Sequence, residues 1–169
     1  VEYIPKYLDD ISAQQLFNQL ERMDDFKNGT TYFGEIPRVQ KWYQTDKKYF
    51  NESWKRRFPR WESHIYEPYI MDLQKQLSQK YDILLNSCLI NKYRTCADSI
   101  KAHQDNQESF GESPTIFGIS CGESRKIKFT RVIPGTLKYD KDRSDNFEIN
   151  LEGGSLLIMD GYTQKYFVH

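Results

Sequence analysis

The stretch that decides the fold and the site reads Asn91-Lys-Tyr-Arg-Thr-Cys-Ala-Asp-Ser-Ile-Lys-Ala-His-Gln-Asp-Asn-Gln-Glu108. At its centre stands His103-Gln104-Asp105. Residues two apart in an extended chain point to the same side, so the imidazole of His103 and the carboxylate of Asp105 can reach one metal ion. With three histidines and 24 acidic residues in 169, an incidental pair is the alternative.

A second histidine would complete a metal site with two nitrogen ligands and one oxygen ligand. Such a face suits Fe(II), because it leaves three coordination positions open for a co-substrate and oxygen. The other histidines are His64 and His169. We interpret His64, which follows a basic segment, as a surface or phosphate-facing residue. His169 ends a predicted strand, and a jelly roll can bring such a strand to face His103 across its barrel. We therefore predict His103, Asp105 and His169 as the ligands.

Short strands separated by turns dominate the chain from residue 83 onward. The predicted strands are 87–94, 99–103, 115–121, 125–132, 147–151, 155–160 and 165–169. Glycine and proline punctuate the connections between them. This pattern favours a jelly roll, the double-stranded β-helix, over alternating β-α units.

Two helices and one extended segment are predicted before these strands. Apolar residues recur at helical spacing in 10–24 and 67–80. The first helix opens on a capping-box pattern, Ser12 with Gln15, and Asn28-Gly29 predicts the turn that ends it. Residues 36–43 look extended. The fold class is therefore mostly β with flanking helices (α+β), in one domain over residues 1–169.

Composition narrows the classes of function. Lys+Arg and Asp+Glu are both 24, which excludes a uniformly basic nucleic-acid binder but allows a local basic patch. No apolar run approaches the length that spans a bilayer. The cysteines, Cys88, Cys96 and Cys121, are odd in number and lack metal-ligand spacing. They indicate reduced thiols and an intracellular protein, nuclear or cytoplasmic.

The segment 38–61 departs from this balance. It holds eight basic and two acidic residues, a net charge of +6, and all three tryptophans. Cations neutralise phosphates and flat rings stack on unpaired bases, so the segment is typical of a binder of single-stranded or base-flipped nucleic acid. The alternative is a solvated loop whose aromatic side chains pack into the core.

Five ordered motifs resemble a known family. They are Leu89-Ile-Asn-Lys-Tyr93, His103-x-Asp105, Ser113-Pro-Thr-Ile116 with Ile119-Ser-Cys-Gly122, Gly154-Ser-Leu-Leu-Ile-Met159, and Thr163-Gln-x-Tyr166-x-x-His169. They are similar to motifs of the AlkB family of Fe(II)- and 2-oxoglutarate-dependent dioxygenases, particularly its eukaryotic and viral DNA-repair branch. The resemblance is dense over 83–169 and thinner at Pro37-Arg38-x-Gln40-x-x-Tyr43.

The resemblance implies a jelly-roll dioxygenase that removes alkyl groups from bases of DNA or RNA with Fe(II), 2-oxoglutarate and O2. It implies that His103, Asp105 and His169 hold the iron. Asn91 and Tyr93 would then hydrogen-bond the carboxylates of 2-oxoglutarate.

Residues 36–66 would form a nucleotide-recognition lid in this family. The implied substrate-binding residues are Arg38, Gln40, Trp42, Tyr43, Asn106 and Gln107. Trp42, Tyr43 or a ring near Tyr49 and Phe50 would stack on the target base. The expected partner is alkylated single-stranded or base-flipped nucleic acid, bound by a monomer, with no membrane involved.

Two departures from the family pattern shape these expectations. Asn106 and Gln107 are amides where the repair branch carries acids, so we expect a different lesion preference, toward neutral bases. The family's further strand with two arginines, one of which binds the distal carboxylate of 2-oxoglutarate, is not among the 169 residues. We expect the chain to be a fragment of a longer protein; Arg125 or Lys128 are conceivable substitutes.

Three alternatives stay open from the sequence. The first is an Fe(II)/2-oxoglutarate oxygenase that acts on a protein or a small molecule. The second is a non-catalytic module that binds single-stranded nucleic acid on an oxygenase scaffold. The third is a soluble β-rich domain with incidental histidines.

Overall fold

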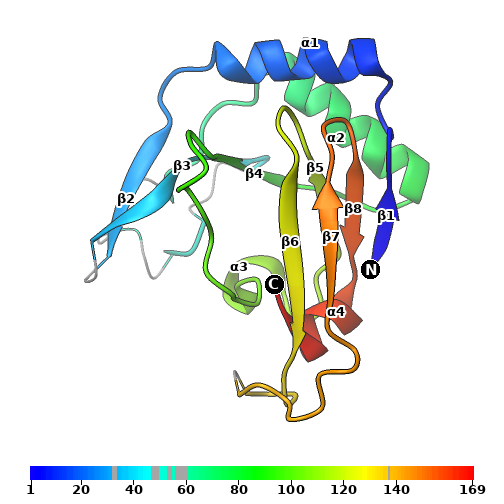
Figure 1. Cartoon of the computed structure of the whole chain (residues 1–169). Coiled ribbons are helices and arrows are strands. Elements are labelled where there is room, and N and C mark those ends of the chain that lie inside the picture. The colour runs from blue at the N-terminus through cyan, green and yellow to red at the C-terminus, as the bar shows by residue number, and fades with distance from the viewer. Residues whose placement is uncertain (32–33, 47–49, 53–54, 56–60, 137) are drawn as a thin grey trace. The chain divides into compact units, whose positions relative to one another are not determined.

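The chain forms two compact units in a computed structural model that describes residues 1–31, 34–46, 50–52, 55, 61–136 and 138–169. The first unit consists of Val1–Arg22 and Lys101–His169, and the second of Met23–Ile100. Figure 1 shows the chain with most of their helices and strands labelled. No helix among the described residues is both long and apolar enough to cross a bilayer.

The first unit contains two three-stranded antiparallel sheets. In the first the order is β1 (Glu2–Ile4), β8 (Leu156–Met159), β5 (Ile116–Ile119). In the second the order is β7 (Phe147–Leu151), β6 (Arg125–Arg131), β9 (Phe167–Val168). Five of these strands lie within segments predicted as strands, namely 115–121, 125–132, 147–151, 155–160 and 165–169.

One apolar core joins the two sheets. Phe129 of β6 and Phe167 of β9 pack in a single buried cluster with Leu157 and Met159 of β8. Because side chains alternate along a strand, the residues next to Phe129 face the other way, and Lys128 pairs with a glutamate of β7 at 3.3 Å. The alternation thus gives the β7-β6-β9 sheet one apolar face and one charged face.

Helix α1 (Asp10–Glu21) lies where the sequence predicts a helix, but its cap differs from the prediction. The Ser12 N–H donates to Oδ1 of Asp9 at 2.8 Å, so Asp9 is the N-cap and the predicted capping box of Ser12 with Gln15 is wrong. Asp9 acts as the N-cap because its extended backbone directs the carboxylate at the first free N–H groups of the helix.

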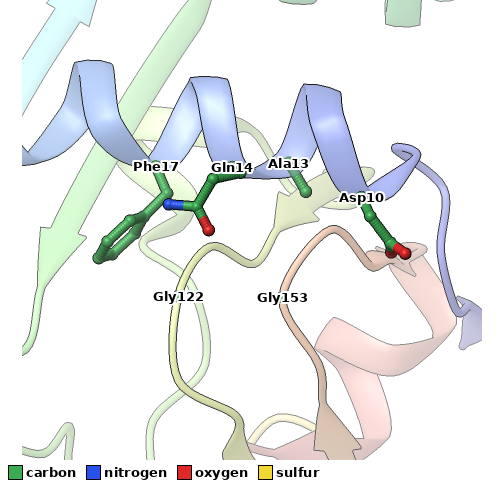
Figure 2. Close-up of a pocket in the computed structure, with 6 residues that line it drawn as sticks. All are labelled: Asp10, Ala13, Gln14, Phe17, Gly122 and Gly153. Atoms are coloured by element: carbon green, nitrogen blue, oxygen red, sulfur yellow. The ribbon is translucent and has the colours of Figure 1, made fainter.

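Glycines let α1 approach two turns of the same unit closely (Figure 2). A Cβ at Gly122, whose φ is +78°, would lie 2.6 Å from the Phe17 ring, and a Cβ at Gly153 would lie 2.7 Å from the Gly122 carbonyl oxygen. Only glycine fits both positions without movement. The helix and the turns line a pocket of about 240 Å³.

The structure differs from the sequence prediction at one irregular segment and two short helices. Residues 99–103 form no strand. Within 165–169 only β9 is extended, because α4 (Gly161–Tyr166) occupies the start. The other helix, α3 (Gln107–Phe110), was not predicted. Side-chain caps decide both helices: Asp160 accepts from the N–H of Thr163 at 3.0 Å, a local signal that outweighs the β-propensity of the following residues.

The described residues of the second unit form one sheet and one helix. The sheet order is β2 (Lys27–Thr31), β3 (Gly34–Gln44), β4 (Ser87–Lys92), all antiparallel, and the helix is α2 (Pro68–Tyr81). The extended segment 36–43, the strand 87–94 and the helix 67–80 are therefore confirmed, with shifted ends. The turn predicted at Asn28-Gly29 is wrong, because both residues lie in β2, where the register shifts between Asn28 and Thr30.

Candidate metal centre

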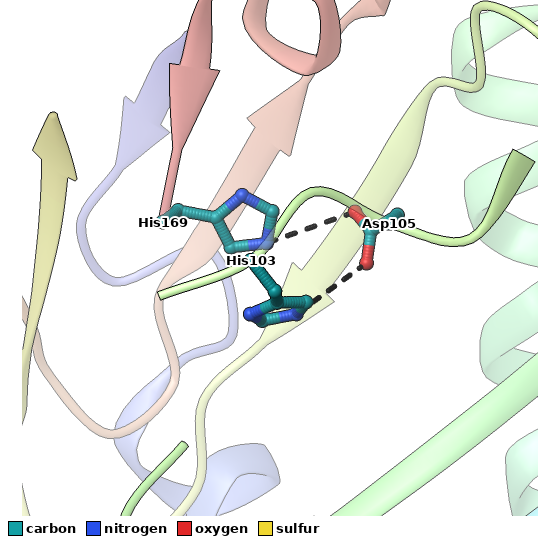
Figure 3. Close-up of side chains that lie close together, drawn as sticks. All are labelled: His103, Asp105 and His169. Atoms are coloured by element: carbon teal, nitrogen blue, oxygen red, sulfur yellow. Dashed lines mark ion pairs between the residues drawn. The ribbon is translucent and has the colours of Figure 1, made fainter. Parts of the chain in front are cut away.

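Three predicted ligands converge in the first unit (Figure 3). One ligand atom each of His103, Asp105 and His169 lies within 4.8 Å of the others. Nε2 of His103 is 3.9 Å from Oδ1 of Asp105, and Nε2 of His169 is 3.7 Å from Oδ2. The structure thus brings together two imidazoles and one carboxylate, the set that binds Fe(II) on one face.

The backbone holds the two histidines side by side. The His103 N–H donates to the His169 carbonyl at 3.0 Å, and the His169 N–H donates to the His103 carbonyl at 2.9 Å. This reciprocal exchange is the pattern of a hydrogen-bonded antiparallel pair. The strand before His169 is itself paired with β6, where Thr130 lies opposite Val168. The core sheet therefore fixes His169, and His169 fixes His103.

Hydrogen bonding selects the ring atom that His103 presents. Its Nδ1 lies 2.9 Å from the Lys101 carbonyl oxygen, which can only accept. The proton therefore sits on Nδ1, and the lone pair of Nε2 faces Asp105.

Burial sets the charge of His169. Its side chain is 7 % exposed, and this burial lowers its pKa to about 4, with Asp105 acting in the opposite direction and His103 in the same direction as burial. A neutral imidazole is the form that binds a metal ion. Among the described residues its buried Nδ1 has no hydrogen-bond partner, so no protein group competes for the orientation of this ring. The donor set and the protonation states fit Fe(II).

Gln164 is a residue at this site that sequence reasoning missed. Its side-chain amide makes two hydrogen bonds to Asp105, one to the backbone N–H at 3.1 Å and one to the carboxylate at 2.5 Å. The sequence signal was the residue's place between Thr163 and Tyr166 in a motif already noted, but 59 residues separate it from Asp105. Only the fold shows that contact.

The predicted co-substrate residues Asn91 and Tyr93 belong to the second unit, and their contact with 2-oxoglutarate stays a prediction. Asn91 lies opposite Gln40 in the β3–β4 pair. Its Oδ1 accepts from Nε2 of Gln40 at 2.8 Å and from Nε of Arg38 at 3.0 Å. Two donors on Oδ1 fix the amide so that Nδ2 points the other way as a donor.

Arg38 and Gln40 were predicted to contact the nucleic acid, and in the structure both donate hydrogen bonds within the second unit. Gln40 is 2 % exposed. Arg38 donates from Nε to Asn91 and from Nη1 to the Ser99 carbonyl at 3.3 Å, and burial lowers the pKa of its guanidinium. These contacts support a role in orienting Asn91, while a phosphate contact of Arg38 stays a prediction.

The rings of Trp42 and Tyr43 are buried, with exposed fractions of 2 % and 0 %. Trp42 packs edge-on against Phe50 at 4.8 Å, and Phe50 stacks on Trp61 at 4.4 Å. A ring must expose one face to stack on a base, so these side chains fit the alternative of packing into the core. The predicted stacking by Trp42, Tyr43 or Phe50 gains no support from their positions.

Two lysines of the segment 38–61 lie near other groups of the protein. Lys41 is buried, and its Nζ donates to the Asp24 carbonyl at 3.2 Å. Lys55 is exposed and lies 3.9 Å from Glu52. The other basic and aromatic residues of the segment lie outside the described residues: Lys47, Lys48, Tyr49, Trp54, Arg56, Arg57, Phe58 and Arg60.

His64 belongs to the second unit and not to the metal cluster. Its backbone N–H donates to the Trp42 carbonyl at 2.8 Å. Burial lowers the pKa of its imidazole, with the nearby charge of Lys41 acting in the same direction. A half-buried, neutral imidazole does not fit the predicted phosphate-facing role.

Asn106 and Gln107 lie directly after the cluster, at the start of α3. Oδ1 of Asn106 accepts from the backbone N–H and the hydroxyl of Ser109, at 2.9 and 3.0 Å, so Asn106 caps this helix. Gln107 is exposed. Their predicted contacts with a base stay predictions, and capping does not require an amide at Asn106, because Asp9 and Asp160 cap helices of the same unit with a carboxylate.

Comparison with known proteins connects this geometry to a family. The sequence model of the 2OG-Fe(II) oxygenase superfamily matches residues 1–169. The alpha-ketoglutarate-dependent dioxygenase alkB homolog 3 of Bos taurus is 28 % identical over 98 % of this chain, and its Homo sapiens counterpart 27 %; the match covers 57 % of each relative. The DNA oxidative demethylase ALKBH2 of Arabidopsis thaliana is 30 % identical over 57 % of this chain and 37 % of that protein.

The chain thus spans a little over half the length of the first two relatives. Among solved structures, that of OsALKBH1 superimposes with a TM-score of 0.64 at 15 % identity, over 99 % of this chain and 83 % of that chain. This likeness confirms the predicted fold class, mostly β with a jelly-roll core. Fe(II), 2-oxoglutarate and O2 are the cofactor and co-substrates of the family. The match over the whole chain and the convergent His-Asp-His cluster show that this chain belongs to the 2OG-Fe(II) oxygenase superfamily.

Proposed function

We propose that this chain carries the iron site of an oxygenase that oxidatively removes alkyl groups from bases of DNA or RNA. The observation that carries the proposal is the cluster of His103, Asp105 and His169 in a member of this superfamily. The similarity to a DNA oxidative demethylase and to alkB homologs supports a nucleic-acid substrate. The target base would be unpaired or flipped out, because its alkyl group must reach the metal site.

The reaction consumes one O2 and one 2-oxoglutarate for each alkyl group. When bound, Fe(II) supplies the activation of O2 and the oxidative decarboxylation of 2-oxoglutarate to succinate and CO2. One oxygen atom enters succinate, and the other becomes the hydroxyl group of a hydroxylated N-methyl group. The C–N bond between this group and the base then breaks. Formaldehyde leaves, and the hydroxyl proton restores the N–H of the base.

The described residues contribute binding and orientation. The imidazoles of His103 and His169 and the carboxylate of Asp105 would hold the metal and leave the remaining positions to the co-substrates. The Lys101 carbonyl keeps Nε2 of His103 directed at the metal position. We further propose that Nδ2 of Asn91 donates to 2-oxoglutarate, which the two donors on its Oδ1 support. The three free thiols fit the expected reducing compartment.

The test uses single-stranded oligonucleotides that each carry one methylated base: 1-methyladenine, 3-methylcytosine or a neutral methylated base. Each is incubated with the protein, Fe(II), 2-oxoglutarate and O2, and its mass is measured. We expect one methyl group to be lost with the wild-type protein and with the control His64→Ala, and none to be lost with His103→Ala. The preferred base shows what Asn106 and Gln107 select.

Two other results would favour the alternatives. If 2-oxoglutarate is converted to succinate while every oligonucleotide keeps its mass, the substrate is a protein or a small molecule. If His103→Ala and Asp105→Ala bind the oligonucleotide as tightly as the wild-type protein, and none of the three turns over, the chain is a non-catalytic binding module.

A further inference from the structure

We propose that Gln164 is a positioning residue of the metal site, whose side-chain amide locks Asp105 as a ligand that binds through one oxygen. The proposal rests on the metal-binding part of the proposed function. It does not depend on the substrate.

The contact is a two-point clamp between one amide and one residue. Oε1 of Gln164 accepts from the backbone N–H of Asp105 at 3.1 Å, while Nε2 donates to Oδ2 of the same residue at 2.5 Å. Gln164 is 4 % exposed, so water competes little for either bond. Both the backbone and the carboxylate of Asp105 are therefore held.

Few side chains can make both bonds. The backbone N–H needs an acceptor and the carboxylate needs a donor, and a primary amide offers both on adjacent atoms. A glutamate would accept but would place a second negative charge against Asp105, and a methionine of similar length would offer neither bond. The clamp thus explains why a glutamine occupies this buried position.

The segment that carries Gln164 also carries a metal ligand. Asp160 caps α4, and the N–H of Gln164 donates to the Asp160 carbonyl at 3.3 Å. Helix α4 leads directly into β9 and then into His169. One short segment therefore positions His169 through the chain and Asp105 through the clamp, and so couples two ligands that lie far apart in sequence.

The clamp also determines how Asp105 can bind. Both of its oxygens face imidazole nitrogens, Oδ1 toward His103 at 3.9 Å and Oδ2 toward His169 at 3.7 Å. A carboxylate with both oxygens free can bind a metal through both and occupy an extra position. Because Gln164 donates to Oδ2, Oδ1 is the oxygen left for the metal, and the open face stays available for co-substrates.

The experiment titrates the metal-free protein with Co²⁺ and measures the dissociation constant by calorimetry and the visible absorption spectrum of the bound ion. The variants are Gln164→Met and Gln164→Glu, with Gln164→Asn as a smaller polar change if either fails to fold. The matched control is Gln74→Met. The side-chain amide of Gln74 also donates a hydrogen bond inside the protein, to the Leu85 carbonyl at 2.7 Å, but this residue lies in the second unit.

We expect the Gln164 variants to bind Co²⁺ about 10- to 100-fold more weakly, as is usual when the partner of a metal ligand is lost. Their spectra should change as well, because a change in how the carboxylate binds alters the ligand field. Gln74→Met should keep the wild-type constant and spectrum even if its melting temperature falls. A purely structural role of Gln164 would lower stability without moving the spectrum.

Other outcomes separate this proposal from the proposed function. Folded Gln164 variants with wild-type affinity and spectrum would overturn the clamp while leaving dealkylation intact. A wild-type protein that binds Co²⁺ in a Gln164-dependent way but dealkylates nothing would keep the clamp and remove the proposed function. A wild-type protein that binds no Co²⁺ would overturn both.

Discussion

The metal cluster and the basic, aromatic segment 38–61 were both predicted as functional regions, but the predicted side chains converge only in the cluster. All three predicted ligands of the cluster lie within 4.8 Å of one another. In the segment, the predicted stacking rings Trp42 and Tyr43 are buried in the core of the second unit. The cluster was predicted from the order and spacing of particular side chains, whereas the segment was predicted from its composition.

The difference shows which sequence signals also specify where the side chains lie in the fold. A metal ion demands particular donor atoms that converge on one point, so the residue types of a correct motif already state which side chains must meet. Basic and aromatic residues together state only that a segment has charges and rings. Burial decides which way each ring faces, and burial depends on the rest of the unit.

The largest expected effect is the loss of the cluster. His103→Ala or Asp105→Ala removes a ligand outright and should weaken Co²⁺ binding by more than about 100-fold, beyond what the loss of a supporting hydrogen bond causes. Calorimetric titration measures this, with His64→Ala as the histidine control outside the cluster. Undiminished Co²⁺ binding by both variants would break the contrast, since the cluster would then not be a metal site.

The next effect concerns the buried rings. Trp42→Ala should lower the free energy of unfolding by about 3–5 kcal/mol, because it leaves a large cavity at a buried site. Urea denaturation measures this, and Ile65→Ala, at a side chain that is 81 % exposed, should change it by less than about 0.5 kcal/mol. If Trp42→Ala keeps its stability but loses affinity for oligonucleotides, Trp42 stacks on a base after all.

Arg38 separates orientation of Asn91 from binding of phosphates. Replacing it by Met removes one donor to Oδ1 of Asn91, so 2-oxoglutarate affinity should fall about 5-fold, the equivalent of about 1 kcal/mol for one hydrogen bond. The salt dependence of oligonucleotide binding should stay unchanged. Lys55→Gln, which removes the charge of an exposed lysine, is the control for the salt dependence of oligonucleotide binding. A drop of about 1 in the salt slope for Arg38→Met would instead identify a phosphate contact.

The smallest effect is the titration of His64. Its pKa is lowered below 6.5 by burial, so the folded state binds this proton less tightly than the unfolded state does. Above pH 6.5 His64 therefore costs no stability. As the pH falls from 6.5 through the folded pKa, stability is lost, and His64→Gln should remove that loss. NMR titration of the ring measures the pKa directly, and a value above 6.5 would contradict the burial.

The sequence by itself determined the fold class, most strands of the jelly-roll core, the helices at 10–24 and 67–80, and the candidate ligand pair His103 and Asp105. These features follow from local periodicity and from the His-x-Asp spacing, which a short stretch of chain carries complete. Local reasoning failed where a local cap was overlooked. Asp160 caps α4, which runs into the start of the predicted strand 165–169, and Asp9 replaces Ser12 as the cap of α1.

Only the tertiary structure decided the rest. The clamp of Gln164 on Asp105 joins residues 59 apart, and the bond of Arg38 to Asn91 joins residues 53 apart. The burial of Trp42 likewise depends on Phe50 and on the rest of its unit. Such contacts form only when distant segments are brought together by their apolar faces, and no periodicity within either segment encodes which polar atoms then meet.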